Sequence, residues 1–318
     1  MDVPSQMMLY SDPLFERHET GAHPECPQRL KSKRQRQNEE SLIARCLPGT
    51  IRNATVEDIG RIHPAEHVQR VRDLAERGGG RIDSDTVVCP ESYEVAVAAA
   101  GTACAAVDAV VASDVRRGLC LIRPPGHHAT RDRAMGFCLF NNIAIAVEHA
   151  RAAHGLKRIL IVDWDVHHGN GTQDIFYEDG DVHFLSTHRS PFYPGGGSAE
   201  ETGSGAGAGA TWNVPFAFGV SRGEFLRVFR ETLDLVAEKC QPELVLVSAG
   251  FDAHRSDPVG SLGLESEDFA SLTEFVLGQA TRYCDGKLVA VLEGGYHLEA
   301  LAESAACHVR ALLGESVP

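Results

Sequence analysis

Short apolar runs alternate with longer amphipathic segments along this chain. The apolar runs predict strands at residues 7–10, 118–123, 158–164, 182–186, 243–249 and 287–293. Several are almost continuously apolar, which is typical of a parallel sheet covered on both faces. The amphipathic segments predict helices at residues 91–113, 139–154, 221–240, 266–284 and 297–313. This order of strand, loop and helix predicts an α/β fold with a doubly wound, mainly parallel central sheet and helices on both faces.

We find no segment with the character of a linker. The stretch 202–211 is rich in glycine, but WNVPF follows it at once, so we expect only a flexible connection there. Its glycines do not follow a strand and open a helix, so they do not form a dinucleotide-binding fingerprint. Because the chain also lacks an internal repeat, we predict one domain over residues 1–318.

Composition and charge narrow the possible partners. The 318 residues are 43% hydrophobic and 23% charged, so the chain can bury a large core. A formal net charge of −14 argues against intrinsic binding to nucleic acid, which depends on Lys and Arg contacts with phosphates. The basic run at 29–37 is a local exception, and we expect it to be a solvated helix face.

The nine cysteines suggest a reducing compartment. None is spaced as a C-x₂₋₄-C pair, so we expect neither a zinc finger nor a redox motif. Unpaired cysteines in a chain of this size predict a cytoplasmic location. The first residues lack the basic start and long apolar core of a secretory signal. No apolar run approaches the roughly 20 residues needed to cross a bilayer, so we expect no membrane association.

Polar residues capable of chemistry follow five of the predicted strands. Ligands bind beyond the carboxyl ends of strands in open α/β sheets, so these residues are expected to meet in one crevice. In chain order, the strand ends supply His127 and His128, then Asp163, Asp165 and His167, then the loop THRSPFYPGGG, then Asp252, and finally Tyr296.

Asp165, His167 and Asp252 form a candidate metal site. Residues i and i+2 of a strand point to the same side, so Asp165 and His167 can face one ion. A catalytic zinc usually has three protein ligands, and Asp252 is the natural third. Each residue alone is explained by a helix cap or a satisfied core histidine, but carboxylates clustered in an apolar crevice require a cation. Asp163 is either a further ligand or a group that orients a histidine.

His127, His128 and Tyr296 are candidates for the other catalytic roles. Histidine has the pKa range of a general base for a water molecule. The Tyr296 hydroxyl can donate to an oxyanion, although a packed aromatic ring with a hydrated hydroxyl is the simpler interpretation of Tyr296 alone. Cys138 is best explained as a buried hydrophobic residue, because a metal-water mechanism needs no thiolate.

Six motifs together resemble one enzyme family. They read HETGAHPECPQRL, RPPGHHA, GFCLFNN, VDWDVHHGNG, SAGFDAH and LEGGYHL, and they extend from about residue 18 to residue 297. In this order they resemble the zinc-dependent histone deacetylase and acetylpolyamine amidohydrolase family, which has the arginase–deacetylase fold. The resemblance covers most of the chain.

The resemblance implies a role for each matching residue. One Zn²⁺ per chain would be bound by Asp165, His167 and Asp252, and structural K⁺ by Asp163, Ser186 and Thr187. His127 would be supported by Asp163 and His128 by Asn170, as in class II-like members. Tyr296 would contact the acyl carbonyl, and an acyl tunnel would be walled by Gly136, Phe137 and Tyr193. Phe137 without the resemblance could equally belong to the core.

The predicted reaction is therefore hydrolysis of an N-acyl amide, with His128 as the base and an acylated lysine or another acylated amine as the substrate. An acetylpolyamine deacetylase is the alternative. A binuclear manganese ureohydrolase is less favoured because Gly169 stands where its motif D-x-H-x-D needs a second acid. A catalytically dead binding module is disfavoured because the full catalytic set is present. The sequence leaves the oligomeric state open.

The loop after Asp252 bears on the choice of substrate. A polyamine carries additional ammonium groups, so a polyamine specialist needs carboxylates at the tunnel mouth. The loop offers apolar Val259 there, and His254 and Arg255 nearby would repel a polycation. Glu91 is a candidate rim carboxylate or substrate-binding group, unless it merely starts the helix at 91–113. On balance we predict a preference for acyl-lysine.

Overall fold

A parallel sheet of eight strands forms the centre of the protein in the computed structural model, which describes residues 6–315. The strand order is β2-β1-β5-β10-β9-β6-β7-β8, and every neighbouring pair is parallel. The strands are β1 (Met7–Tyr10), β2 (Leu47–Pro48), β5 (Arg117–Cys120), β6 (Ile159–Asp163), β7 (Val182–Arg189), β8 (Thr211–Phe216), β9 (Leu244–Ala249) and β10 (Leu288–Leu292). A separate antiparallel ribbon pairs β3 (Gly80–Arg81) with β4 (Val87–Val88).

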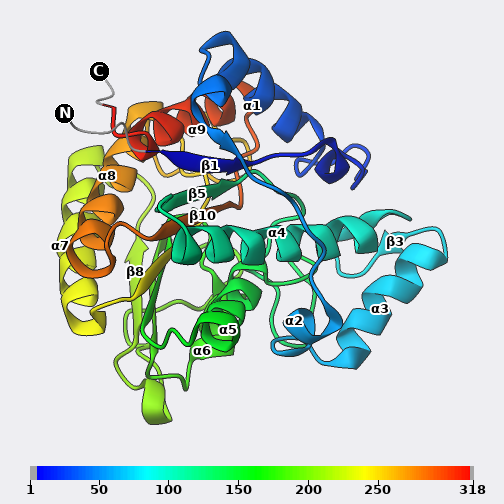
Figure 1. Ribbon diagram of the computed structural model, residues 1–318, viewed down its shortest axis with the longest axis horizontal. Coiled ribbons are helices and arrows are strands. Elements are labelled where there is room, and N and C mark those ends of the chain that lie inside the picture. The colour runs from blue at the N-terminus through cyan, green and yellow to red at the C-terminus, as the bar shows by residue number, and fades with distance from the viewer. Residues whose placement is uncertain (1–5, 316–318) are drawn as a thin grey trace.

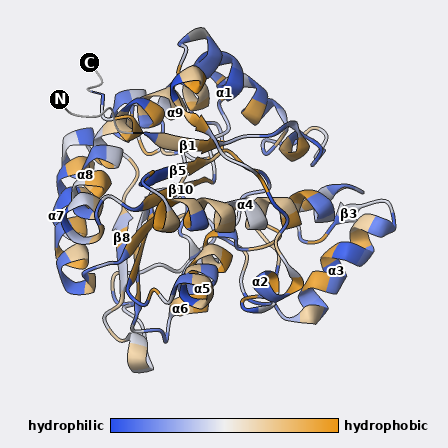
Figure 2. Ribbon diagram, viewed as in Figure 1, coloured by the Kyte–Doolittle hydropathy of each residue, from blue (hydrophilic) through white to orange (hydrophobic). Residues whose placement is uncertain are grey.

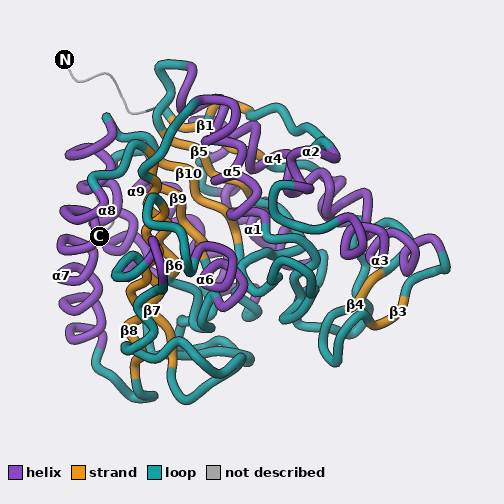
Figure 3. The backbone as a smooth tube through the Cα atoms, turned by 90° about the horizontal axis from the view of Figure 1, so that it is seen from below, coloured by secondary structure: helices purple, strands orange, loops and turns teal. Residues whose placement is uncertain are grey.

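Helices cover both faces of this sheet (Figures 1 and 3). One face carries α1 (Gln28–Glu39), α7 (Arg222–Cys240), α8 (Ser266–Cys284) and α9 (Leu298–Leu312). The other carries α4 (Ser92–Ala112), α5 (Asn142–His154) and α6 (Asn170–Phe176), with α2 (Val56–Gly60) and α3 (Ala65–Glu76) packed outside them. Single 3₁₀ turns lie at Pro13–Glu16, Ile43–Arg45 and Gly205–Gly207.

Burial of the central strands on both faces explains their unbroken apolar sequences. Every residue of β6, β9 and β10 is buried. Orange, hydrophobic ribbon is concentrated at the centre of the molecule (Figure 2). One continuous hydrophobic core includes both faces of the sheet. The predicted α/β class and parallel sheet are therefore confirmed.

The segment between β5 and α5 departs from the predicted boundaries. The strand ends at Cys120 and the helix begins at Asn142, so residues 121–141 form a long loop. The side chain of Asn141 caps α5 by accepting a hydrogen bond from the Ala144 amide. This loop carries the two tandem histidines to the carboxyl edge of the sheet.

Strand β8 was not predicted from the sequence. The glycine-rich stretch 202–211 contains a 3₁₀ turn and leads directly into β8, which pairs with β7 at the sheet edge. Gly203 shows why glycine is needed in this stretch. Its φ is +97°, and a Cβ atom there would overlap the carbonyl of Gly207. The glycines thus permit a tight connection, and the predicted flexible connection is replaced by ordered turns.

The basic run 29–37 forms helix α1, but it is not a uniformly solvated face. Arg29, Lys33 and Gln37 are completely buried. Their spacing of four residues places them on one side of the helix. The prediction of a solvated face is wrong for this side because α1 packs against α9 and over the carboxyl ends of the central strands.

Helix α4 is long and apolar enough, by length and composition alone, to cross a membrane. The prediction that no apolar run approaches such a length is therefore wrong for residues 92–112. However, 67% of its most apolar window is buried inside the protein. The helix packs against α5, β5 and β10, so its apolar composition is explained by a place in the core.

Gly101 allows helix α4 to approach the chain at residues 52–54. A Cβ atom at Gly101 would overlap the backbone of Asn53 and Ala54, so Gly101→Ala should lower the free energy of unfolding by about 1–3 kcal/mol. Gly278 in α8 is exposed with open space around it, so Gly278→Ala should instead raise stability by about 0.5–1 kcal/mol. Urea denaturation measures both changes. Equal stability of the two variants would contradict the close approach.

Candidate active site

Three metal-binding side chains meet at the carboxyl edge of the sheet. Asp165 and His167 follow β6, and Asp252 follows the neighbouring strand β9. Their ligand atoms all lie within 4.8 Å of one another. His167 Nδ1 is 3.0 Å from Asp165 Oδ1 and 3.1 Å from Asp252 Oδ2, so this ring nitrogen faces both carboxylates.

The electrostatics of this group fit a small divalent cation. All three side chains are buried. Burial and then the charge of Asp165 raise the pKa of Asp252 to about 7 in the metal-free protein. The contact from His167 is close but poorly aligned, so Asp252 Oδ2 has no hydrogen-bond partner. Two buried carboxylates and one ring nitrogen, with one oxygen unsatisfied, are a donor set suited to Zn²⁺.

The tandem histidines differ in their partners. His127 Nδ1 is 2.9 Å from Asp163 Oδ2, and His128 Nδ1 is 2.8 Å from Asn170 Oδ1. Both partner atoms accept hydrogen bonds, so each Nδ1 carries a proton.

These partners also separate the two pKa values. Burial opposes the charged form of His127, but the charges of Asp163 and Asp165 outweigh burial and raise the pKa of His127 to about 10. Burial and the neighbouring His127 keep the pKa of His128 well below its usual range. His127 is consequently the cationic member of the pair, and His128 is the neutral one.

A buried ionic layer beneath the site was missed by sequence reasoning. Glu293 Oε2 accepts hydrogen bonds from the amides of Gly126 and His127 at 2.7 and 3.2 Å. Arg29 donates to the carbonyls of Gly295 and Glu293 at 2.6 and 2.5 Å, and its guanidinium lies 5.0 Å from the Tyr296 ring centroid. This layer fixes the loops that carry His127 and Tyr296.

Two further charged residues complete this layer. Glu25 contacts both Arg29 and Arg123, and all three side chains are completely buried. Burial opposes ionisation of Glu25, but Arg123 and Arg29 outweigh it and lower its pKa. Glu25 and Arg29 both belong to the motif HETGAHPECPQRL, which therefore reaches under the site.

A narrow cavity of about 170 Å³ leads to these groups. Its lining residues are Asp85, His128, Gly136, Phe137, His167, Phe192, Tyr193, Val259 and Tyr296. The set includes every predicted tunnel residue except Glu91, which stands immediately before α4 at its helix start. The carboxylate in the lining belongs to Asp85 and not to Glu91. Phe192 stacks on His167 with ring centroids 5.2 Å apart.

Backbone conformation shapes one wall of the cavity. Gly136 has a φ of +56°, and a Cβ atom there would overlap the His128 ring. Phe137 has a φ of +71°, a left-handed conformation that is strained for a side chain of this size. Its amide donates to Thr86 Oγ1 at 3.1 Å, which helps to hold the ring in the wall.

The opposite wall is held by Arg189. Its guanidinium lies between the rings of Phe192 and Phe218, 4.2 and 4.4 Å from their centroids. It also donates to the carbonyl of Gly260 at 3.1 Å, next to Val259. Arg189 thereby joins the loop after β7 to the loop after β9.

The three residues predicted to bind potassium lie next to one another. Asp163, the last residue of β6, is the register partner of Ser186 within β7. Thr187 Oγ1 is 3.5 Å from the Asp163 carbonyl, while Ser186 Oγ is 2.9 Å from His188 Nδ1. Their role as potassium ligands stays a prediction.

Comparison with known proteins is consistent with this geometry. Residues 23–312 match the histone deacetylase domain. The chain belongs to the histone deacetylase family. It is 42% identical over 274 residues to a histone deacetylase-like amidohydrolase of Pseudomonas aeruginosa, covering 86% of this chain and 71% of that protein. The predicted deacetylase and amidohydrolase activity is thereby supported, and the chain is an enzyme of this type.

Two other similarities extend over nearly the whole of this chain. It is 41% identical to human polyamine deacetylase HDAC10 over 330 residues, which cover 100% of this chain and 48% of that protein, so it spans about half of that relative. The crystal structure of the HDA15 HD domain matches with a TM-score of 0.93 and 37% identity, covering 99% of this chain and 91% of that chain. These similarities favour an amidohydrolase over the ureohydrolase alternative.

Proposed function

We propose that this deacetylase removes short acyl groups from lysine side chains, using one Zn²⁺ per chain. The observation that carries this proposal is the meeting of Asp165 and Asp252 with His167, which lines a cavity of about 170 Å³ with aromatic walls. Such a cavity suits a linear, apolar stem that ends in an amide. The reacting bond would then lie beside His128 and Tyr296.

The chain's own residues can perform each proton transfer. When bound, Zn²⁺ would polarise the acyl oxygen and lower the pKa of a water molecule. His128, neutral at Nε2, takes the proton from the attacking water and later gives it to the departing amine. The cationic His127 stabilises developing negative charge. The Tyr296 hydroxyl, whose pKa is raised well above its usual value by burial, stays protonated and donates to the acyl oxygen.

A structural K⁺ is also part of the proposal. The adjacency of Asp163, Ser186 and Thr187 supports it, because all three offer oxygen atoms beside the end of β6. Such an ion would stiffen the strand ends next to the zinc ligands. The nine cysteines, all free, support a further proposal that the enzyme works in a reducing compartment such as the cytoplasm.

The cavity mouth favours acyl-lysine over an acetylpolyamine. Val259 contributes an apolar side chain there, and Asp85 is the single carboxylate in the lining. One carboxylate can accept a hydrogen bond from a peptide N–H of the substrate, whereas a polyamine presents several ammonium groups. Arg255 is engaged with Glu265 at 2.8 Å, so the repulsion predicted from Arg255 is weakened.

Tyr296→Phe tests the role of the hydroxyl. The substitution keeps the ring over Arg29 and removes one donor, so kcat on an acetyl-lysine peptide should fall by about 10²–10³. Zinc content, measured in parallel, should be unchanged because Tyr296 is not among the proposed ligands. A kcat within twofold of the wild-type value would show that the hydroxyl does not serve the transition state.

Val259→Glu tests the control of substrate choice at the mouth. The wild-type enzyme should have a higher kcat/KM for an acetyl-lysine peptide than for acetylspermidine, measured at one salt concentration. The added carboxylate should shift this ratio toward acetylspermidine by about fivefold, as expected for one partly exposed ion pair. The matched variant Val259→Gln introduces a side chain of nearly the same shape as glutamate but without its charge, so it should leave the ratio unchanged. A wild-type preference of tenfold for acetylspermidine would contradict the proposed substrate.

A further inference from the structure

A second group of metal-binding side chains lies far from the catalytic cavity. Asp108 is near the end of α4, and His149 and His154 are in the last turns of α5. Both helices lead directly into the starts of strands, β5 and β6. The group is thus near the amino edge of the sheet, whereas the catalytic residues follow the carboxyl ends.

The geometry of this group brings three ligand atoms to one point. His149 Nε2 and His154 Nε2 each lie 2.7 Å from the same oxygen, Asp108 Oδ1. The three ligand atoms are all within 4.8 Å of one another. Burial opposes ionisation of Asp108, but the hydrogen bonds from both histidines lower its pKa, so the carboxylate is charged.

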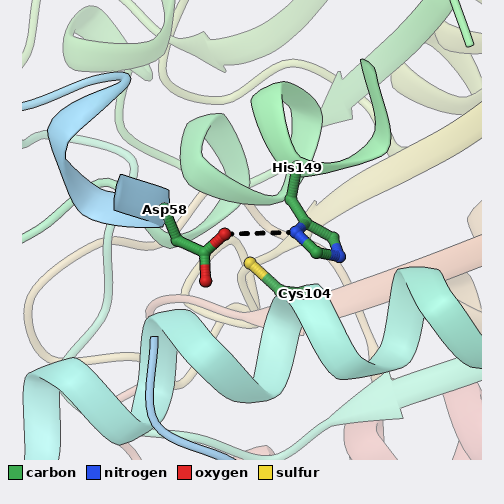
Figure 4. Close-up of side chains that lie close together, drawn as sticks. All are labelled: Asp58, Cys104 and His149. Carbon is green, nitrogen blue, oxygen red and sulfur yellow. Dashed lines mark hydrogen bonds and ion pairs between the residues drawn. The ribbon is translucent and has the colours of Figure 1, made fainter. Parts of the chain in front are cut away.

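A carboxylate behind His149 orients its ring. His149 Nδ1 is 3.2 Å from Asp58 Oδ1, a contact drawn in Figure 4. Asp58 also accepts hydrogen bonds from Arg52 and Arg61 at 3.0 and 3.1 Å, so it is ionised and needs a donor from the ring. The Nδ1 atom therefore donates to Asp58, and Nε2 faces Asp108 Oδ1, where a bound metal would take the place of the Nε2 proton. A carboxylate that holds the remote N–H of a histidine is the usual support of a metal ligand.

Cys104 lies beside Asp58 and His149 but does not suit a metal at that position (Figure 4). Burial raises the pKa of its thiol to about 12, so a metal at this position would have to displace a tightly held proton. Asp58 is occupied by two guanidinium groups as well. The group formed by Asp108, His149 and His154 is the better site, because 42% of the Asp108 side chain and 19% of the His154 side chain are exposed and an ion can enter with its water ligands.

We propose that Asp108, His149 and His154 form a second site for a divalent transition metal such as Zn²⁺ or Ni²⁺. Two imidazole nitrogens and one carboxylate oxygen suit these ions, and water completes the coordination. The bound ion links α4 to α5, and through Asp58 to α2, so its effect is structural rather than catalytic. Arg52, whose guanidinium is 4.0 Å from Asp108 Oδ2, limits the affinity by repulsion.

Titration with Ni²⁺ of enzyme that carries a single Zn²⁺ per chain, followed by calorimetry, tests the proposal. The wild-type protein should bind one equivalent of Ni²⁺ while its zinc content stays constant. His154→Gln keeps a donor for Asp108 but loses the ligand nitrogen, and Asp108→Asn loses the anionic ligand. Each should weaken Ni²⁺ binding at least tenfold. Glu148→Gln is the matched control, because Glu148 is on the same helix and pairs with Arg151 instead.

A second readout separates a metal site from a simple ion pair. Ni²⁺ should raise the Tm of the wild-type and Glu148→Gln proteins but not that of His154→Gln, since only the first two can link α4 to α5 through the ion. Acetyl-lysine hydrolysis should be equal in all of them, which shows that the variants fold. Absence of Ni²⁺ binding, or equal binding by all four proteins, would overturn the proposal.

Discussion

The arrangement of the whole structure depends on two carboxylates that are buried side by side. Asp165 and Asp252 both contact one nitrogen of His167, and all three side chains are removed from solvent. Like charges at this depth are unfavourable unless a cation lies between them. The parallel sheet imposes this arrangement, because β6 and β9 are neighbours and their carboxyl ends release both residues at one edge. The strand order thus brings together a set of donors that fits a metal ion.

The ionic layer below the cavity gives this centre its rigidity. Glu293 accepts hydrogen bonds from the amides of Gly126 and His127. Arg29 donates to the two carbonyls, of Glu293 and Gly295, that shortly precede Tyr296. Glu25 forms ion pairs with both of the buried arginines, Arg29 and Arg123. Because buried charges are costly unless every one of them is paired, loss of one member would strain the others. The precise placement of His127 and Tyr296 therefore rests on residues that never touch a substrate.

The sequence predicted those features that follow from local periodicity and strand order. Asp165 and His167 could be assigned to one side of a strand end because side chains alternate in strands, and Asp252 followed an equivalent strand. The ionic layer could not be predicted, since Arg29 meets the carbonyl of Glu293 across 264 residues of chain. The place of Asp85 in the cavity lining could not be predicted either. Tertiary contacts set the fold of the loop before α4, and they bring Asp85 rather than Glu91 to the cavity. Strand β8 was missed because glycine-rich turns precede it.

The central claim is that one divalent cation bound by Asp165, His167 and Asp252 is the reaction centre. Anomalous diffraction at the zinc absorption edge, from crystals of zinc-loaded enzyme active on acetyl-lysine, tests this claim most directly. The account predicts a strong peak about 2.0–2.2 Å from His167 Nδ1 and from one oxygen of each carboxylate. An active enzyme with no anomalous peak between these three side chains would contradict it.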